Sequence, residues 1–284
     1  MKTPMLGVLT LPFDKYLEAD GISQSMLKHM ARSPAHFQYA LTHKEPPTEN
    51  QIIGRIFHTA VLEPDQFAGS FYLRPETYPG PNGPKKWNGN SNFCKDWLDD
   101  HSNLEVITLD QHQMILDMKK SVMEHPSARR ALEAGKTEYS LFVKDPETGI
   151  GLKCRPDRLS GNTIPDLKST IDASPEGFAR QVAQRGYDVQ AAFYLDVANW
   201  CGLDKKYFIF IACEKEPPYA VGVYQLDEQS IECGRSKYRR WLNTAALCYE
   251  TNEWPAYDPA IKTLALPDWS VRQEMNTSAL MLTE

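Results

Sequence analysis

Through the first half of the chain, apolar residues recur at every third or fourth position, which is the spacing of helices that bury one face. Ser23 and Ser33 each precede such a segment, and a serine at that place accepts hydrogen bonds from the free N–H groups of a helix start. Pro34 follows Ser33, as is common at the first helical position. The pattern predicts helices over 22–43 (in two parts), 50–63, 91–99 and 109–134.

The second half of the chain contains short runs of β-branched and aromatic residues, which are typical of strands. Among them, a helix or helix pair is predicted over 174–202, beginning after Ser174, and a long amphipathic helix over 227–250. This order predicts an α/β fold with a central mixed sheet flanked by helices and with N-terminal helical additions. The predicted strands are 137–144, 151–159, 163–169, 205–213 and 219–226.

Two stretches show neither the periodicity of a helix nor that of a strand. Residues 78–92 are rich in Pro, Gly, Asn and Lys, and they predict a mobile loop. The last part of the chain holds three prolines and two tryptophans with little periodicity, so we expect an extended tail. The chain is therefore expected to form one domain in three parts: a mainly helical part (20–135), an α/β core (136–250) and the tail (251–284).

Composition excludes several classes of protein. A net charge of −6 gives no support to a surface that coats nucleic acid broadly, although an acidic protein can still line a channel with cations. Six cysteines without a C-x-x-C pair argue against zinc and iron–sulfur sites and are typical of reduced thiols. The apolar run near the N-terminus is too short for a signal peptide, and no segment reaches transmembrane length. We therefore expect a cytoplasmic protein without a membrane partner.

The Gly161-Asn162 dipeptide is of the kind that closes a two-residue hairpin turn. Counting outward from this turn places Asp157 opposite Asp166, with Lys168 two residues further along on the same face. Opposed carboxylates about 5 Å apart repel each other, and a divalent cation between them would turn the repulsion into attraction. Arg155 shares this face and is the better candidate for a phosphate contact. An exposed hairpin with a charged outer face is the alternative interpretation.

Two helical motifs bear on this cluster. Gly54 and His58 lie four residues apart and so share a helix face, where the glycine would let another backbone approach closely. Gln190 and Tyr194 share a face in the same way, and Tyr187 joins them. Taken alone, His58 fits a hydrogen-bonded, half-buried histidine better than a metal ligand. The second motif, taken alone, fits a polar stripe at the boundary of a helix and a sheet.

Candidate contacts to nucleic acid lie in two basic runs. Lys85 and Lys86 precede Trp87 in the loop rich in Pro and Gly, and this combines cations with a ring that can stack on a base. A second run, in the helix over 227–250, is suited to phosphates. It consists of Arg235, Lys237, Arg239 and Arg240. A solvated face is the commoner role of such runs.

Four motifs follow one another along the chain: Gly54-x-x-x-His58, Arg-Pro-Asp157, Asp166-Leu-Lys168 and Gln190-x-x-x-Tyr194. In this order they resemble the PD-(D/E)xK nucleases, and more narrowly the RecB-type branch. Residues 22–25, 58–64 and 266–269 are similar to the RecE-type (exonuclease VIII) recombination exonucleases. The resemblance covers most of the chain and implies a restriction-endonuclease-like core.

The resemblance also implies a role for each residue. It implies a metal ion, Mg²⁺ with Mn²⁺ as the alternative, held by two carboxylates, a histidine and a backbone carbonyl. These ligands are Asp157, Asp166, His58 and Leu167. The implied catalytic residues are Asp157, Asp166, Lys168, Gln190 and Tyr194, the last two on a helix that supports the scissile phosphate. The second acid is Asp where Glu is commoner, which requires a slightly closer metal.

For a relative of this kind, the resemblance implies 5′→3′ degradation of linear double-stranded DNA from a free end. It implies a ring-shaped homo-oligomer that leaves 3′ single strands for a single-strand annealing protein. Two alternatives stay open: another nuclease of the superfamily, Cas4-like or restriction-type, and a non-catalytic DNA-binding relative. The missing cysteine cluster argues against the iron–sulfur forms. The presence of Asp157, Asp166 and Lys168 argues against a non-catalytic relative.

Overall fold

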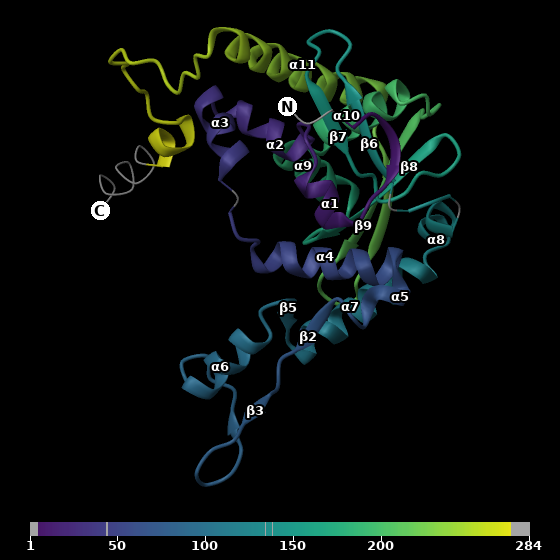
Figure 1. Cartoon of the computed structure of the whole chain (residues 1–284), viewed down its shortest axis with the longest axis vertical. Coiled ribbons are helices and arrows are strands. Elements are labelled where there is room, and N and C mark those ends of the chain that lie inside the picture. The colour runs from purple at the N-terminus through teal and green to yellow at the C-terminus, as the bar shows by residue number, and fades with distance from the viewer. Residues whose placement is uncertain (1–4, 44, 134, 138, 274–284) are drawn as a thin grey trace, which may run out of the picture.

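Two three-stranded sheets lie at the centre of the protein, with helices on both sides (Figure 1). The computed structural model describes residues 5–43, 45–133, 135–137 and 139–273. The first sheet is antiparallel and has the order β1 (Gly7–Thr10), β6 (Tyr139–Lys144) and β7 (Gly151–Cys154). The second sheet is mixed and has the order β10 (Val221–Gln225), β9 (Tyr207–Glu214) and β8 (Thr163–Thr170). The predicted α/β class is confirmed, with the strands divided between two sheets.

Of the hairpin predicted between β7 and β8, only the turn forms; the two strands do not pair with each other. Ser160 and Thr163 pair across the turn, as the sequence predicts. Beyond them, Leu159 pairs with Lys136 and not with Ile164, and the two strands belong to different sheets. The prediction that Asp157 pairs with Asp166 across a hairpin is therefore wrong.

A close approach of two segments explains this break. Gly135 has a φ of +95°, and an added Cβ would stand 2.1 Å from the carbonyl oxygen of Leu159. Only a glycine can adopt this conformation at so short a distance, and the segment beside it takes the place that the hairpin partner would need. β8 pairs instead with β9 in parallel along eight residues, which satisfies its backbone N–H and C=O groups on that side.

The helices are α1 (Phe13–Glu18), α2 (Gln24–Leu27), a 3₁₀ turn η1 (Lys28–Ala31), α3 (Pro34–Thr42), α4 (Glu49–Leu62), α5 (Pro64–Phe67), α6 (Asn92–Asp100), α7 (Leu109–Glu124), α8 (Pro126–Glu133), α9 (Pro175–Arg185), α10 (Tyr187–Trp200) and α11 (Glu228–Thr251). Ser23, Ser33 and Ser174 cap α2, α3 and α9, as predicted. The helix expected over 109–134 is two helices, because Pro126 lacks the N–H that a continuous helix needs. Positions 134 and 138, which the predictions placed in a helix and a strand, lie outside the described residues. Among the helices described, none is long and apolar enough to cross a lipid bilayer.

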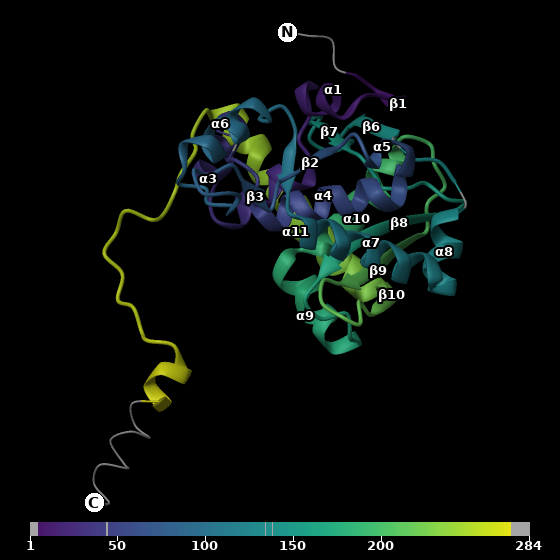
Figure 2. The same ribbon diagram turned by 90° about the horizontal axis from the view of Figure 1, so that it is seen from below.

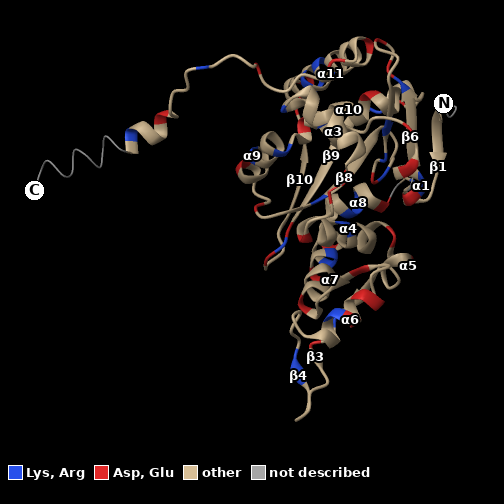
Figure 3. Ribbon diagram, turned by 60° about the vertical axis from the view of Figure 1, so that its left-hand side comes forward, with Lys and Arg blue, Asp and Glu red and all other residues tan. Residues whose placement is uncertain are grey.

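Residues 71–107 form an arm that projects away from the two sheets (Figure 1). At its base, β2 (Phe71–Leu73) and β5 (Glu105–Ile107) pair in parallel. Further out, β3 (Thr77–Tyr78) pairs with β4 (Lys85–Lys86), so the stretch predicted to be a loop holds a short hairpin. Figure 3 shows β4 near the far end of this arm, while acidic and basic residues are scattered over the other elements.

The second sheet is covered on both faces, and the residues of β8 alternate between them. Ile164 belongs to an apolar cluster with α10 and α11, whereas Leu167 belongs to a cluster with α4 and α7. Side chains two residues apart point to the same face of a strand, so Asp166 and Lys168 lie on the α10 side. The sheet thus places two charged groups at the edge of a core that contains Phe193.

The chain after α11 leaves the body as a tail that is extended as predicted, except for a short helix over residues 268–273 (Figure 2). Trp254 still packs on Phe37, with ring centroids 5.9 Å apart. Further along, Ile261 and Leu264 are almost fully exposed, at 103% and 90%. This part of the tail therefore adds little to the core. Residues 274–284 of the predicted tail lie outside the described part of the chain.

Candidate active site

Asp157 lies where the chain passes from the first sheet to the second, and its carboxylate is held from two sides. Oδ2 accepts a hydrogen bond from the backbone N–H of Leu167 (2.8 Å) and lies 3.3 Å from Nδ1 of His58. His58 comes from α4, so the histidine helix and the first acid are in direct contact. The side chains of Asp157 and His58 are 17% and 30% exposed, which leaves both accessible to small molecules.

Asp166 and Lys168 project from one face of β8 toward α10, as their spacing predicts. Nε2 of Gln190 donates a hydrogen bond to Oδ1 of Asp166 over 2.8 Å, and the Lys168 ammonium forms an ion pair with Oδ2. The ammonium also lies 4.9 Å from the centre of the Tyr187 ring, where a cation is attracted by the ring face. Both charged side chains are largely buried, so each depends on these partners.

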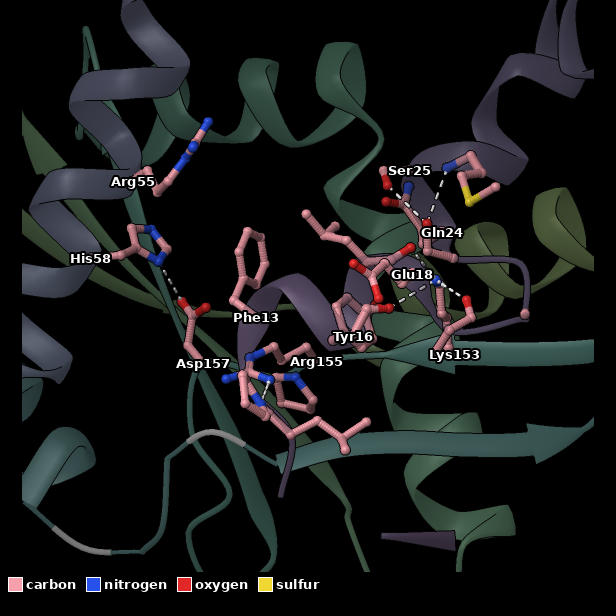
Figure 4. A pocket seen from close by; sticks show the side chains of 18 of the residues that line it. Phe13, Tyr16, Glu18, Gln24, Ser25, Arg55, His58, Lys153, Arg155 and Asp157 are labelled. Carbon is pink, nitrogen blue, oxygen red and sulfur yellow. Dashed lines mark hydrogen bonds and ion pairs between the residues drawn. The ribbon is translucent and has the colours of Figure 1, made fainter. Parts of the chain in front are cut away.

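A cavity of about 1640 Å³ opens beside these residues (Figure 4). Its wall includes four of the predicted catalytic and metal-binding residues, namely His58, Asp157, Gln190 and Tyr194. Three cations also line it: Arg55, Lys153 and Arg155. The wall also holds four acids (Glu18, Asp20, Glu63 and Asp157), whereas Asp166 and Lys168 are not part of it. A cavity that combines carboxylates with cations can receive an anionic chain beside a metal ion.

Residues 23–264 match a family described as a PDDEXK-like domain of unknown function (DUF3799). This chain belongs to that family. The resemblance to the PD-(D/E)xK superfamily is thereby confirmed. No curated protein matches the sequence significantly.

Two of the similar solved structures come from bacterial exonucleases or their proposed relatives. A proposed exonuclease from Eubacterium rectale has a TM-score of 0.60 at 13% identity, with 91% of this chain and 96% of that chain covered. An alkaline exonuclease from Laribacter hongkongensis shares 13% identity over 57% of this chain and 86% of that chain, but its TM-score is 0.25. Together with the family match, the first likeness shows that this PDDEXK-like domain has the restriction-endonuclease-like fold.

In the PDDEXK-like site, burial and neighbouring charges shift the pKa values of the two acids, Asp157 and Asp166, in opposite directions. Burial raises the pKa of Asp166 to about 6; the charge of Asp157 adds to the rise, and the Lys168 ammonium opposes it. For Asp157, burial acts in the same direction, but His58 and Lys168 outweigh it and the pKa is lowered. Burial alone would lower the pKa values of His58 and Lys168, yet the carboxylates raise both. The carboxylates thus favour the charged forms of both bases.

The donor groups fit a divalent cation, although they are not arranged around one. Across the described residues, no three His, Cys, Asp or Glu side chains converge closely enough to make a ready-formed metal site. Oδ2 of Asp166 is buried and accepts no hydrogen bond of good geometry, and the Lys168 ammonium lies against it. The N–H and C=O of one residue leave a strand on the same side, so the Leu167 carbonyl is directed toward Asp157. Two carboxylates, an imidazole and a carbonyl oxygen are ligands that Mg²⁺ or Mn²⁺ accepts.

The predicted DNA contacts lie in two different places. Arg155 lines the cavity, but its guanidinium also donates hydrogen bonds to the carbonyl of Leu11 (2.6 Å) and the hydroxyl of Ser140 (3.0 Å). Lys85 and Lys86 are exposed on the arm and are not part of the cavity wall. As DNA contacts, these three residues remain predictions.

Most cations of the second basic run, in α11, form ion pairs within the fold. These ion pairs join α11 to α10 and to the turn between β6 and β7. The pairs are Arg235–Asp196, Lys237–Asp188 and Arg239–Asp145. Since these cations have carboxylate partners within the fold, they are poorly suited to bind phosphate.

Sequence reasoning missed two parts of the cavity wall. Arg55 lies one helical turn before His58, so the i, i+3 spacing could have identified it. It is half-exposed and forms an ion pair with Glu105 at the base of the arm (3.0 Å). Phe13 and Tyr16 come from the N-terminal segment, and no local pattern connects that segment to the site.

Gly54 is not packed as the sequence suggested. An added Cβ would meet its nearest atom, Oγ of Ser169, at 3.7 Å, which is an ordinary van der Waals contact. The expectation that this glycine admits a closely approaching backbone is therefore wrong, and α4 has room for a methyl group at this position.

Proposed function

We propose that this PDDEXK-like domain is a divalent-metal-dependent nuclease that hydrolyses phosphodiester bonds in DNA. The observation that carries the proposal is the meeting of Asp157, Asp166 and Lys168 with His58 and Gln190 beside one cavity. Burying carboxylates is costly unless they are paired. A cluster of such groups with pKa values shifted in opposite directions therefore favours a catalytic role over a structural one.

Four groups would hold the metal ion, with Mg²⁺ as the proposed cofactor and Mn²⁺ as the alternative. They are the side chains of Asp157, Asp166 and His58 and the carbonyl oxygen of Leu167. When bound, such an ion acts as a Lewis acid toward the phosphate. Gln190 fixes the orientation of Asp166 through its hydrogen bond, in the way that outer partners of metal ligands usually do.

Lys168 and Tyr194 supply the remaining chemistry. The Lys168 ammonium is held beside Asp166 with a raised pKa, so it stays charged, orients the attacking water and stabilises negative charge that develops on the phosphate. Burial raises the pKa of Tyr194 well above its usual value. Its phenol therefore stays protonated and donates a hydrogen bond to the scissile phosphate from the cavity wall.

The proposed substrate is linear double-stranded DNA, degraded 5′→3′ from a free end by a ring-shaped homo-oligomer. Direction and ring follow from the resemblance to RecE-type exonucleases. The charge distribution is compatible with them, because a net charge of −6 opposes adhesion to DNA along an open surface. A closed ring needs only inward-facing cations, such as Lys85, Lys86 and Arg155, and it retains DNA by topology between cuts. A single-strand annealing protein would then receive the 3′ strand.

A digestion experiment tests this function. Linear duplex and covalently closed circular duplex are each incubated with Mg²⁺, with Mn²⁺ and with EDTA. We expect the linear DNA to be degraded with either metal, to survive in EDTA, and the circles to be spared. Degradation should continue for many nucleotides after an excess of competitor DNA is added.

The other outcomes separate the alternatives. Rapid cutting of closed circles would favour an endonuclease, and no cleavage with either metal would favour a DNA-binding relative. The variants Asp157→Ala, Asp166→Ala and Lys168→Ala serve as controls, since each should lose cleavage while its far-ultraviolet circular dichroism stays that of the folded protein.

A further inference from the structure

The segment from β1 through α1, residues 7–18, is called the strap below because it lies across the catalytic cavity. Most of its residues from Thr10 onward belong to the cavity wall. Figure 4 shows the ring of Phe13 between Asp157 and Tyr16. Phe13 lines the cavity while 49% of it remains exposed. An aromatic ring that lies open in a cavity wall can serve as a contact surface for a ligand.

Contacts with two neighbouring residues fix the orientation of the Phe13 ring. It stacks on Tyr16, which is buried, with centroids 6.4 Å apart and planes 25° apart. The guanidinium carbon of Arg155 lies 5.9 Å from the centre of the Phe13 ring. The ring therefore presents its free surface to the cavity without needing to be ordered by the ligand.

Two cations from β7 and its end fix the strap itself. The ammonium of Lys153 is buried and donates to the carbonyl oxygens of Tyr16 (3.0 Å), Leu17 (3.3 Å) and Ala19. Arg155 donates to the carbonyl of Leu11 (2.6 Å). Burying an ammonium is unfavourable unless such bonds are formed, so the fold specifies the position of the strap closely.

We propose that Phe13 is a base-stacking residue, which holds the nucleobase of the nucleotide next to the scissile phosphate. This inference rests on the proposed nuclease function. The flat face of a base is the part of a nucleic acid that an aromatic side chain binds regardless of sequence. The same wall carries mostly polar and charged groups, which suit a polar chain and not an apolar peptide. They include Arg55, Gln24 and Ser25 and the acids Glu18, Asp20 and Glu63.

Stacking on a side chain requires a base face that no neighbouring base covers. In DNA such a face is found at a strand end, so the proposed ligand of Phe13 is the terminal base of a strand.

Binding without cleavage tests the proposal. The probe is a short single-stranded oligonucleotide with 2-aminopurine at its end, whose fluorescence falls when the base stacks, measured in EDTA and again in Ca²⁺. Phe13→Ala should weaken binding about 5- to 150-fold and abolish the quenching. Phe13→Trp should retain both, whereas Phe13→Leu, which keeps apolar bulk without an aromatic face, should lose the quenching. Phe93→Ala removes a ring of similar exposure (45%) outside the cavity and should change nothing.

A matched change in the DNA completes the test. When the terminal nucleotide is abasic, the wild-type protein and Phe13→Ala should bind equally weakly. The proposal is overturned if Phe13→Ala weakens abasic and normal oligonucleotides alike, if Phe13→Leu quenches as the wild type does, or if the wild type binds neither. Since no step requires cleavage, a failed Mg²⁺ digestion would overturn the nuclease proposal while leaving a positive stacking result intact.

Discussion

The position of His58 allows its two possible roles, structural and metal-binding, to be distinguished by experiment. Its ring touches Asp157, yet 30% of the side chain stays exposed beside the cavity. His58→Ala should raise the Mg²⁺ concentration for half-maximal cleavage at least about tenfold, because one ligand is lost. The thermal unfolding midpoint of the metal-free protein should change little. Metal titrations of cleavage and calorimetry check the two parts.

The matched control is His112, whose ring packs on Phe67 with centroids 5.7 Å apart. His112→Ala should lower the unfolding midpoint and leave the metal titration unchanged. If His58→Ala shows this same pattern, His58 is a packing residue.

Gln190 touches the second acid through one hydrogen bond, which makes its contribution measurable. Gln190→Ala should lower cleavage about 10- to 100-fold, since Asp166 would no longer be held in one orientation. Steady-state cleavage rates across a range of Mg²⁺ concentrations measure this loss. Gln113→Ala removes a similar amide–carboxylate contact on an exposed helix surface (3.1 Å to Asp117) and should have no effect on cleavage. Equal rates for wild type and Gln190→Ala would contradict the assignment.

Among the elements, α11 depends on a buried ion pair to the turn between β6 and β7. The Asp145 side chain is fully buried, and it accepts hydrogen bonds from Arg239 and from the N–H of Thr148 (2.9 Å). Burial would raise the pKa of Asp145, but these hydrogen bonds outweigh it and hold the pKa below its usual value. The carboxylate form therefore stabilises the folded state.

The pH dependence of this contribution has a definite sign. A carboxyl group with a lowered folded-state pKa stabilises the protein above its unfolded-state pKa of about 4, and the effect is lost as the pH falls through the lower folded value. Asp145→Asn should thus reduce the free energy of unfolding at pH 7 by on the order of 3 kcal/mol. The gap to wild type should shrink below about pH 4. Urea unfolding at pH 7, 5 and 3 measures it.

An exposed pair provides the comparison. Glu124 lies 4.0 Å from Lys120 on the surface of α7, and both side chains are mostly exposed. Glu124→Gln should leave the free energy of unfolding nearly unchanged at each pH. A gap between wild type and Asp145→Asn that widens toward acid would show that the Asp145 pKa is not lowered.

Elements with local signals could be predicted from the sequence, and contacts between distant segments could not. Ser23 and Ser33 cap helices through neighbouring N–H groups, and Asp166 and Lys168 share a face because strands have a period of two. The hairpin register failed because Gly135, far from the turn, brings another segment against Leu159. The two acids still meet, since Asp157 binds the backbone of β8 itself.

On the scale of the whole molecule, the tail divides into an anchored part and a free part. Trp254 packs on Phe37, and the carbonyl of Pro255 accepts a hydrogen bond from the N–H of Ala35 (3.1 Å). Removing all residues after Asp258 should therefore leave the unfolding midpoint unchanged. Removing all residues after Asn252 should lower it by several degrees, because buried aromatic surface is lost. Differential scanning calorimetry of both truncations checks this, and equal midpoints for the two would contradict the division.

The proposed catalytic residues could be found from the sequence because they follow one another in a known order of motifs. The cavity around them depends on contacts between segments that are far apart in the chain. His58 and Gln190 stand on helices whose spacing is visible in the sequence. The strap reaches the same cavity through the pairing of β1 with β6. No periodicity indicates that pairing, so the aromatic wall could be found only in the fold.

The hydrogen bonds from Lys153 to the strap cannot form until Lys153 has been synthesised. Tyr16 and Lys153 are 137 residues apart, so the strap leaves the ribosome roughly 7–30 s before its anchor at translation rates of about 5–20 residues per second. During that interval it has neither β6 nor Lys153 to bind, and contacts of such long range form late in folding. The first described segment to be made therefore waits for residues 139–166, which supply its strand partner, its anchor and both acids of the site.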